Sequence, residues 1–289
     1  MKIFLTGASG FIGNYFIQHY QEKYTIETFS FLQENFNDLD LLKSDVVIHL
    51  SALVHQMGGA AKEEYERVNV KQTLDLAKKA KKSGVKQFIF MSSVKVYGEE
   101  SNSAYSEQTL CKPKDPYGES KLKAENELRK LEDENFRVAV IRTPIVYGYG
   151  VKANIKNLVS LVEKIPVLPF AKINNRRSMI YIGNLAYFID IIIQKQVSGI
   201  FLVADKRALS TSELIELIAL ALGKRVYLIK LPLFESFLKR VKPSFHKRLF
   251  GSLEIDNKET MYRLFADEKD PLPYSIEDGI NLMINGEKQ

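Results

Sequence analysis

Short apolar runs alternate with amphipathic stretches through the first half of the chain. The runs that are too short for buried helices, and so predict strands, are Lys2–Thr6, Thr25–Ser30, Val46–Leu50, Gln87–Met91 and Arg137–Ile141. The stretches with helical periodicity are Phe11–Tyr20, Lys62–Lys82 and Tyr117–Glu134. Strands that alternate with helices in this way predict an α/β fold with a doubly wound parallel sheet.

The second half of the chain alternates less regularly. From Asn154 onward the expected elements are a helix over Asn154–Glu163, a proline-bounded connector over Ile165–Pro169, a strand over Ser178–Ile182, a helix over Leu185–Gln194, a strand over Gly199–Val203 and a serine-capped helix over Ser210–Leu222. We therefore expect a dinucleotide-binding domain over 1–148. Residues 149–289 would be mainly a smaller substrate lobe, with some segments returning to the sheet.

Composition narrows the class of protein. The 289 residues are 45% hydrophobic, which provides ample core, and no apolar run reaches the length of a membrane span. The first residues enter a strand without a signal-peptide pattern, so we expect a cytoplasmic protein. The lone Cys111 excludes an intramolecular disulfide, and His49, His55 and His246 do not form a metal-binding set.

The net charge of +6 is concentrated in one segment, because residues 224–258 hold nine Lys or Arg and three Asp or Glu. Within it, 231–249 interleaves apolar and basic residues, and Pro243 divides it into two short elements. Three interpretations stay open: packing of the lobe with a diphosphate contact from Arg248, contact with a membrane surface, or nucleic-acid binding. The last is disfavoured, because no nucleic-acid-binding motif accompanies the charge.

A glycine-rich turn follows the first strand. Gly7, Gly10 and Gly13 are spaced three apart, where small residues allow a tight turn, a close approach to a pyrophosphate and packing of the next helix. The amino terminus of that helix would face the negative charge. The turn therefore predicts a dinucleotide cofactor.

Tyr117 and Lys121 lie four residues apart and share one face of a helix. A nearby ammonium favours the phenolate and can bring a tyrosine toward useful acid–base strength. Ser93 follows a predicted strand at its carboxyl end, where doubly wound sheets bind their ligands. Its hydroxyl can hydrogen-bond a substrate oxygen. Together with the glycine turn, these residues predict hydride transfer next to a tyrosine acid/base.

These motifs stand in a fixed order together with others along the chain, namely Thr6–Gly13, His49–Ala52, Val68–Val70, Ser92–Gly98, Tyr117-x-x-x-Lys121 and Arg142–Gly148. In this order the chain resembles the extended short-chain dehydrogenase/reductases, specifically the NAD-dependent epimerase/dehydratase family of nucleotide-sugar enzymes. Beyond Gly148, the segments Val151–Asn154, Leu168–Phe170, Asn175–Ser178 and Arg248–Leu253 look like a bacterial polysaccharide-locus subgroup. Its members include UDP-2-acetamido-2,6-dideoxy-4-hexulose reductases and UDP-hexose 4-epimerases, and some are thought to act on sugars attached to polyprenyl diphosphate.

The resemblance implies a role for individual residues. Tyr117 would be the acid/base at the sugar C4 oxygen, Ser93 would hydrogen-bond the same oxygen, and Lys121 would lower the tyrosine pKa and bind the nicotinamide ribose. The substrate diphosphate and uridine would be held by Asn154, Arg177 and Arg248. The implied cofactor contacts are Gly7, Gly10, Phe11, Ile12, Gly13, Ser30, Asp38, Leu39, Leu50, Ser51, Ala52, Asn69, Tyr117, Lys121 and Pro144.

Three positions depart from the family pattern. Ser30 stands where NAD-binding members usually have an acid for the adenine ribose, and no Lys or Arg lies between Phe29 and Leu42. The missing acid removes one reason to exclude NADP, and it weakly favours NADP over NAD as the cofactor. The segment Phe31–Asp45 is too short for a full helix and strand, so the adenine side must be abbreviated. Ile145 replaces an asparagine frequent in UDP-hexose epimerases, which favours a 6-deoxy sugar.

These observations rank three functions. The first is reduction of a UDP-2-acetamido-2,6-dideoxy-4-hexulose at C4, and the second is 4-epimerisation of a UDP-hexose with bound NAD. A non-catalytic NAD(P)-binding regulator ranks third, because such relatives commonly lose the Tyr or the Lys. A 4,6-dehydratase is disfavoured, since Val94-Lys95 follows Ser93 in place of Asp-Glu. The resemblance also implies a homodimer through Lys62–Lys82 and Tyr117–Glu134.

Overall fold

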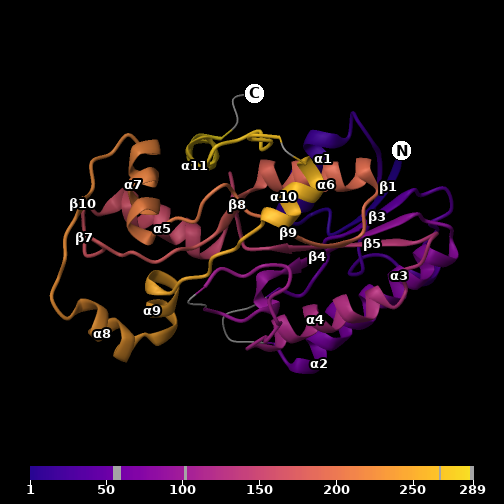
Figure 1. Cartoon of the computed structure of the whole chain (residues 1–289), viewed down its shortest axis with the longest axis horizontal. Coiled ribbons are helices and arrows are strands. Elements are labelled where there is room, and N and C mark those ends of the chain that lie inside the picture. Colours follow the sequence, from indigo (N-terminus) through magenta and orange to yellow (C-terminus); the bar gives the residue numbers. More distant parts are fainter. Residues whose placement is uncertain (55–59, 101–102, 267, 287–289) are drawn as a thin grey trace.

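The computed structural model describes residues 1–54, 60–100, 103–266 and 268–286, so that His55 lies outside the described residues. Within them, parallel strands form a six-stranded sheet at the centre of one half of the molecule (Figure 1). In sheet order these strands are β2 (Thr25–Phe29), β1 (Lys2–Thr6), β3 (Val46–His49), β4 (Gln87–Ser93), β5 (Arg137–Thr143) and β9 (Gly199–Leu202). The predicted doubly wound α/β fold is confirmed.

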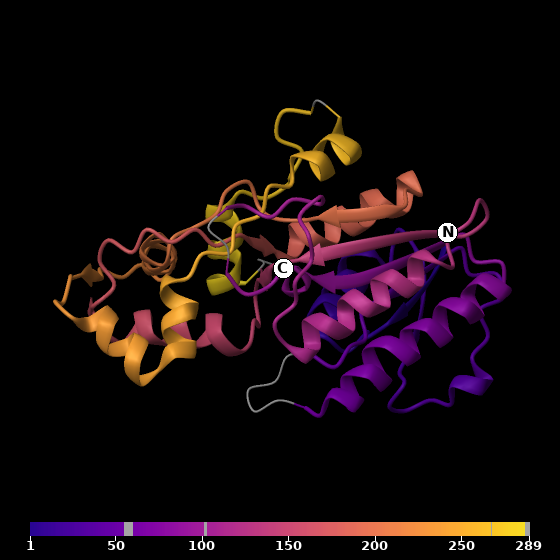
Figure 2. The same cartoon turned by 60° about the horizontal axis from the view of Figure 1, so that its bottom comes forward.

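Helices cover both faces of this sheet (Figure 2). One face packs against α1 (Phe11–Tyr20), α6 (Ile182–Lys195) and α10 (Lys258–Phe265), and the other against α3 (Gln72–Lys82) and α4 (Pro116–Arg129). Within β1, Ile3 and Leu5 join the first core and Phe4 the second. Because the central strands β1 and β3 are apolar on both faces, they appear in the sequence as continuous apolar runs, whereas the edge strand β2 is largely exposed.

The second lobe extends from one end of the sheet, on the left in Figure 1, around its own apolar core. Its helices are α5 (Ala153–Lys164), α7 (Thr211–Ala221), α8 (Phe234–Val241), α9 (Pro243–Phe250) and α11 (Ile276–Asn285). Two short parallel pairs complete it: β6 (Ile145–Tyr147) with β8 (Met179–Tyr181), and β7 (Val167–Leu168) with β10 (Tyr227–Leu228). None of the helices in the described residues is long and apolar enough to cross a membrane.

Two expected helices differ from the prediction. The stretch 62–82 is divided into α2 (Lys62–Tyr65), a π-helical turn (Glu66–Lys71) and α3. The helix α4 ends at Arg129, before the predicted Glu134, and a tight turn in which Asp133 pairs with Phe136 follows it. The connector after β2 holds only a short 3₁₀ turn at Phe36–Asp38, as its length predicted.

The face implied for a homodimer is formed by α2, α3 and α4 and is strongly charged. A groove over these helices is lined mostly by Lys, Arg, Asp and Glu, with Val70 and Leu74 among them. Ion pairs join the helices within one chain, from Lys62 to Glu119 and from Lys123 to Glu66. Dimerisation would have to bury these charges, and the homodimer stays a prediction.

Candidate active site

The glycine turn is packed backbone to backbone against the end of β3. Gly7 has a φ of +79°, and a Cβ there would lie 2.8 Å from the Ser51 nitrogen and 2.9 Å from the Leu50 carbonyl carbon. At Gly13 a Cβ would lie 2.3 Å from the Gly7 oxygen. Both positions therefore need glycine on steric grounds. The turn brings α1 close to the carboxyl ends of β1 and β3, as the motif predicted.

The amino terminus of α1 suits an anion. Gly10 occupies the N-cap and cannot provide a capping side chain, and the first turn of the helix contains no acidic residue. The N–H groups of Phe11, Ile12 and Gly13 belong to the first turn, which has no carbonyl partners within the helix. A pyrophosphate fits here, because those N–H groups and the helix dipole favour negative charge.

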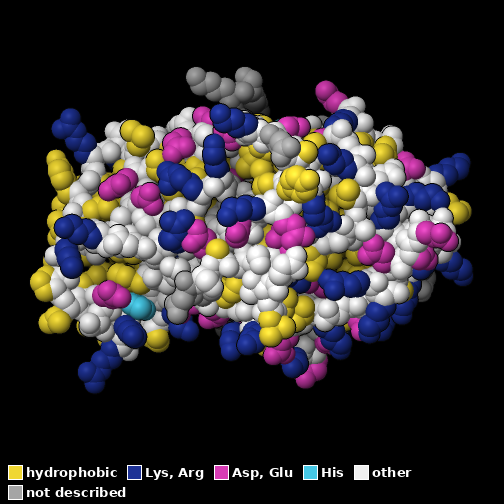
Figure 3. Space-filling view, viewed as in Figure 1, with side chains coloured by type: hydrophobic (Ala, Val, Ile, Leu, Met, Phe, Trp, Pro, Cys, Tyr) yellow, Lys and Arg dark blue, Asp and Glu magenta, His cyan; other side chains and the backbone are white. Residues whose placement is uncertain are grey.

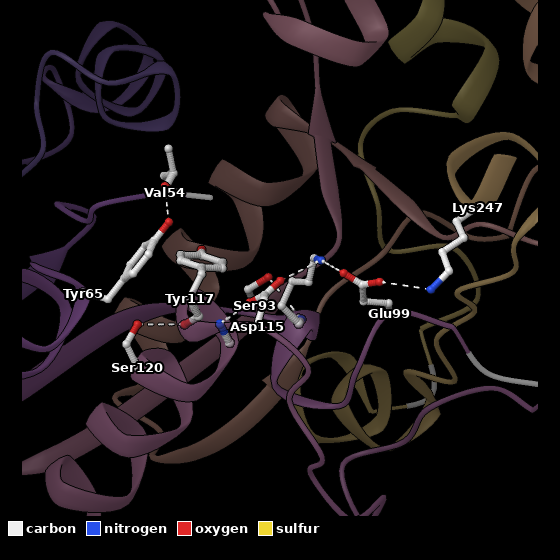
Figure 4. Close-up of polar contacts among 10 residues, drawn as sticks. Val54, Tyr65, Ser93, Glu99, Asp115, Tyr117, Ser120 and Lys247 are labelled. Carbon is white, nitrogen blue, oxygen red and sulfur yellow. Dashed lines mark hydrogen bonds and ion pairs between the residues drawn. The ribbon is translucent and has the colours of Figure 1, made fainter. Parts of the chain in front are cut away.

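The helix that carries Tyr117 is fixed at its start. Asp115 is the N-cap, and the Gly118 N–H donates to its Oδ1 over 2.7 Å. A Cβ at Gly118 would lie 2.6 Å from the Lys95 oxygen, so glycine lets α4 approach the loop that follows β4. This contact places Tyr117 next to Ser93, at the end of β4 (Figure 4).

Burial and hydrogen bonding act in opposite directions on Tyr117. Burial raises the pKa of its hydroxyl to about 12, while a hydrogen bond with Ser93 lowers it. The Lys121 ammonium donates to the Met91 carbonyl over 2.8 Å and lies 4.5 Å from the centre of the Phe90 ring. Burial lowers the pKa of Lys121 to about 7. Ser93 is thus the partner that favours the phenolate in this arrangement, and the role implied for Lys121 stays a prediction.

Asn69 joins α4, the helix that carries Tyr117, to the loop after β3. It is fully buried in the π-helical turn, accepts from the Leu53 N–H over 2.8 Å, and donates to the Leu53 carbonyl and to Ser120 Oγ. Ser120 in turn donates to the Tyr117 carbonyl. Because π-helical turns are rare and frequently found at functional positions, this geometry explains how Asn69 comes close to the site. The sequence did not single out Ser120.

A buried ion pair anchors the same helix to the sheet, and the sequence did not predict it. Arg142 on β5 donates to both carboxylate oxygens of Glu125, with Nη2 2.5 Å from Oε2. Ser92 also donates to this carboxylate, and Arg142 Nη1 donates to the Tyr97 hydroxyl over 2.6 Å. The only sequence signal was the position of Glu125, one helical turn after Lys121 on the same face of α4.

The residues implied for the adenine side lie around the end of β2. Ser30 follows the strand, Asp38 lies exposed in the 3₁₀ turn, and Leu39 is buried. The Ser30 N–H donates to a carboxylate oxygen of Glu34 over 2.7 Å. The carboxylate of Glu34, four residues after Ser30, therefore lies at the carboxyl end of β2. Sequence reasoning missed Glu34 because it compared the strand end alone.

The structure brings the implied substrate-side residues together. Arg248 donates to Asn154 Oδ1 over 3.1 Å, and Arg177 donates to the Gly251 carbonyl over 3.0 Å. Burial and the nearby charge of Arg248 both lower the pKa of Arg177. Two close guanidinium groups of this kind suit an anion, since their planar forks match phosphate oxygens.

The remaining residues implied for the cofactor also lie at the carboxyl edge of the sheet. Leu50, Ser51 and Ala52 directly follow β3, and the Ser51 N–H donates to Thr6 Oγ1 over 3.4 Å. Pro144 lies between β5 and β6. Ile145 begins β6 and is partly exposed.

The described histidines have structural partners. His49 is buried between the Thr6 and Thr73 hydroxyls, at 2.7 and 2.9 Å, and burial lowers its pKa to about 3, so the ring is neutral. His246 faces Glu235 at 3.2 Å across α8 and α9.

A parallel sheet with a glycine turn after β1, a serine at the end of β4 and a Tyr-x-x-x-Lys pair on the following helix α4 defines the short-chain dehydrogenase/reductase class of enzymes. Residues 3–204 match the NAD dependent epimerase/dehydratase family, and the chain belongs to this family.

Curated relatives extend the likeness to most of the chain. A UDP-glucose 4-epimerase of Vibrio cholerae is 35% identical over 293 residues, covering 90% of this chain and 89% of the relative. The N-acetyl-alpha-D-glucosaminyl-diphospho-ditrans,octacis-undecaprenol 4-epimerase of Escherichia coli O157:H7 is 27% identical and covers 80% and 75%. The solved UDP-glucuronic acid 4-epimerase of Bacillus cereus, in complex with NAD, shares the fold with a TM-score of 0.77 at 20% identity, covering 99% and 98%.

The comparisons bear on two expectations from the sequence. The family is NAD-dependent, and the lean toward NADP finds no support. The relatives named here are 4-epimerases, so the reduction that the sequence ranked first is not confirmed, while the epimerase alternative is well supported.

Proposed function

We propose that this chain is a 4-epimerase of UDP-hexoses that uses tightly held NAD. The observation that carries the proposal is the 35% identity to a UDP-glucose 4-epimerase across 90% of the chain. The Ser93–Tyr117 pair supplies the acid/base that the reaction needs, and Val94-Lys95 leaves out the acid pair that a dehydratase requires. The proposal reverses the order in which the sequence ranked reduction and epimerisation.

Tyr117 and Ser93 have different roles at the sugar C4. Tyr117 takes the proton from the C4 hydroxyl while the carbon is oxidised, and it returns the proton when the carbon is reduced on its other face. To act as this base it must be a phenolate, so its raised pKa would have to fall, as a nearby positive charge such as that of Lys121 favours. Ser93 hydrogen-bonds the same oxygen and favours the phenolate. Bound NAD supplies the hydride acceptor and donor. The glycine turn at Gly7 and the start of α1 would hold its pyrophosphate.

The far side of the substrate would lie against the second lobe. Arg177 and Arg248 would bind the diphosphate, with Asn154 holding Arg248 in place. A second candidate substrate is a sugar linked through a diphosphate to undecaprenol, because the Escherichia coli relative is a 4-epimerase of such a molecule. Both candidates present the same two phosphates to these arginines.

The test compares substrates with the purified, NAD-loaded protein. We expect UDP-glucose or UDP-N-acetylglucosamine to interconvert with its C4 epimer, measured by chromatography, without net change in the absorbance of reduced cofactor. A second assay tests an undecaprenyl-diphosphate N-acetylhexosamine for the same C4 interconversion. Stoichiometric loss of reduced cofactor on a UDP-4-keto-6-deoxy-HexNAc, without interconversion of the others, would instead establish the reductase.

We further propose that Glu34 selects NAD over NADP. Its carboxylate accepts the Ser30 N–H at the end of β2, where the adenine ribose of a dinucleotide lies in this fold. A carboxylate has about four lone-pair sites, so it can accept this bond and a ribose hydroxyl as well. The phosphate of NADP would meet a like charge at the same place.

Replacement of Glu34 tests this selection. Glu34→Gln is expected to weaken NAD⁺ binding about tenfold, since hydrogen bonds to charged groups contribute about 1.5–3 kcal/mol. It should also reduce the difference in affinity between NAD⁺ and NADP⁺. Calorimetric titration of both cofactors into cofactor-stripped protein measures the effect. Glu22→Gln, an exposed acid that precedes β2, is the control. Unchanged affinities in Glu34→Gln would remove Glu34 from the cofactor site.

A further inference from the structure

The helix α8 carries apolar residues on two faces. Its inner side chains, Phe234 and Leu238, pack into the core of the second lobe. On the outside, Leu233, Phe237 and Val241 follow one another at intervals of four residues and are 81%, 60% and 55% exposed. A helix on the surface of a globular protein normally has one apolar face. The outer stripe is therefore not explained by packing within the chain.

The neighbouring two-stranded sheet repeats this arrangement. Val167 pairs with Tyr227, and these side chains are 46% and 61% exposed on the same face. Ile165, Ile229 and Leu231, in the segments that flank these two strands, are exposed as well. Leu168 and Leu228, on the other face, belong to the lobe core. The outer face of the small sheet is apolar as well.

These two surfaces adjoin, because Leu231 and Leu233 join the strand to the helix. Together they form one apolar surface at the end of the molecule, the tip patch, which consists of Ile165, Val167, Tyr227, Ile229, Leu231, Leu233, Phe237 and Val241. In Figure 1, β7, β10 and α8 occupy the left end. Hydrophobic side chains gather at that end in Figure 3, beside Lys and Arg. Exposed apolar side chains that gather at one end of a molecule favour an interaction site there.

Basic residues surround the tip patch. Lys230, Lys239, Arg240 and Lys242 lie within or beside its segments and are exposed. Among the described residues, none of the four is in an ion pair with a carboxylate. Glu235 is the acidic residue of α8, and it faces His246. The patch thus combines exposed apolar side chains with uncompensated positive charge.

We propose that the tip patch docks on an anionic membrane surface. Its apolar side chains would enter the boundary between headgroups and acyl chains, while the four cations would contact anionic headgroups. A second copy of the chain fits less well, because symmetric contact would bring the same uncompensated cations together. The inference depends on this surface alone, and it holds whether or not the 4-epimerase proposal does.

Docking would also orient the substrate site. The helix α9 follows α8 directly, and it carries Arg248, which contacts Asn154. The arginines proposed to bind a diphosphate are therefore close to the docking surface. A sugar diphosphate held at the membrane by a lipid would reach them without leaving the headgroup layer.

Sedimentation with vesicles tests the proposal. We expect the full chain to bind vesicles of phosphatidylcholine and phosphatidylglycerol at low salt, and to bind pure phosphatidylcholine weakly. Raising the salt should weaken binding, because headgroup attraction is screened. The charge variant Lys239→Glu/Arg240→Glu/Lys242→Glu should lower the partition coefficient by about tenfold or more, since each cation near an anionic surface contributes about 1 kcal/mol.

Matched variants separate apolar contact from charge. Leu233→Ser/Phe237→Ser/Val241→Ser should also lose vesicle binding, while its circular dichroism and its turnover of a free UDP-sugar stay unchanged. Leu42→Ser/Tyr262→Ser removes exposed apolar side chains far from the tip and should bind vesicles like the parent chain. The proposal is overturned if the parent fails to bind anionic vesicles at low salt, or if both serine variants bind equally well. It is also overturned if the stripe variant alters only the molar mass in light scattering, which would assign the surface to a second copy.

Discussion

Replacement of Tyr117 with phenylalanine is expected to lower kcat for C4 interconversion by about 10²–10⁴-fold, the usual contribution of a positioned acid/base. The change removes one hydroxyl next to Ser93 and leaves the ring, which lies 6.3 Å from that of Tyr65, in place. Chromatography of UDP-hexose products measures the loss. Calorimetric titration should show NAD⁺ affinity close to that of the parent protein.

The control for this variant is Tyr262→Phe, which removes an exposed hydroxyl on α10. It should leave turnover unchanged. If Tyr117→Phe interconverts UDP-hexoses at the parent rate, the acid/base is another group, and the mechanism proposed for C4 fails. If it loses NAD⁺ binding together with turnover, the hydroxyl acts on the cofactor and not on the sugar.

The second large effect concerns the buried pair between Glu125 and Arg142, whose side chains are 2% and 3% exposed. Arg142→Met should lower the free energy of unfolding by about 3–5 kcal/mol, because it leaves a buried carboxylate without its counter-charge. The Ser92 hydroxyl would remain as a hydrogen-bond partner of Glu125. Urea unfolding followed by circular dichroism measures the change.

A double replacement distinguishes loss of the pair from loss of packing. Glu125→Met/Arg142→Leu removes both charges, and we expect it to be more stable than Arg142→Met. Glu127→Gln, which removes the half-buried partner of the exposed Lys130 on the same helix, is the control and should change the urea midpoint little. If Arg142→Met unfolds at the parent midpoint, the pair does not stabilise the contact of α4 with the sheet.

The local pattern of apolar residues was sufficient to predict most strands of the sheet. The apolar runs at Lys2–Thr6 and Arg137–Ile141 were recognisable because a parallel strand is buried on both faces. The glycine turn was recognisable as well, from the spacing of its glycines. The structure explains why Gly7 is needed there, because its close contact with the end of β3 excludes any side chain. Tyr117 and Lys121 could be paired because one helical turn separates them.

Other features depend on residues far apart in the chain. Glu125 and Arg142 lie on a helix and a strand, and no periodicity signals that their side chains meet inside the protein. The carboxylate of Glu34 returns to Ser30 through a turn whose path the sequence does not specify. The split of the long helix around Asn69 was missed for the same reason, because its partners Leu53 and Ser120 come from separate segments.

The tip patch shows the same division between sequence and structure. The mixture of apolar and basic residues over 231–249 was visible in the sequence, and it permitted lobe packing and membrane contact alike. Only the tertiary structure decided that Phe234 and Leu238 face the core while Leu233, Phe237 and Val241 face outward. By itself the sequence determined the parallel fold and predicted which residues would carry the chemistry, because both inferences rest on local spacing. Burial, ion pairing and exposure were decided by the tertiary structure, because they depend on what the folded chain brings against each side chain.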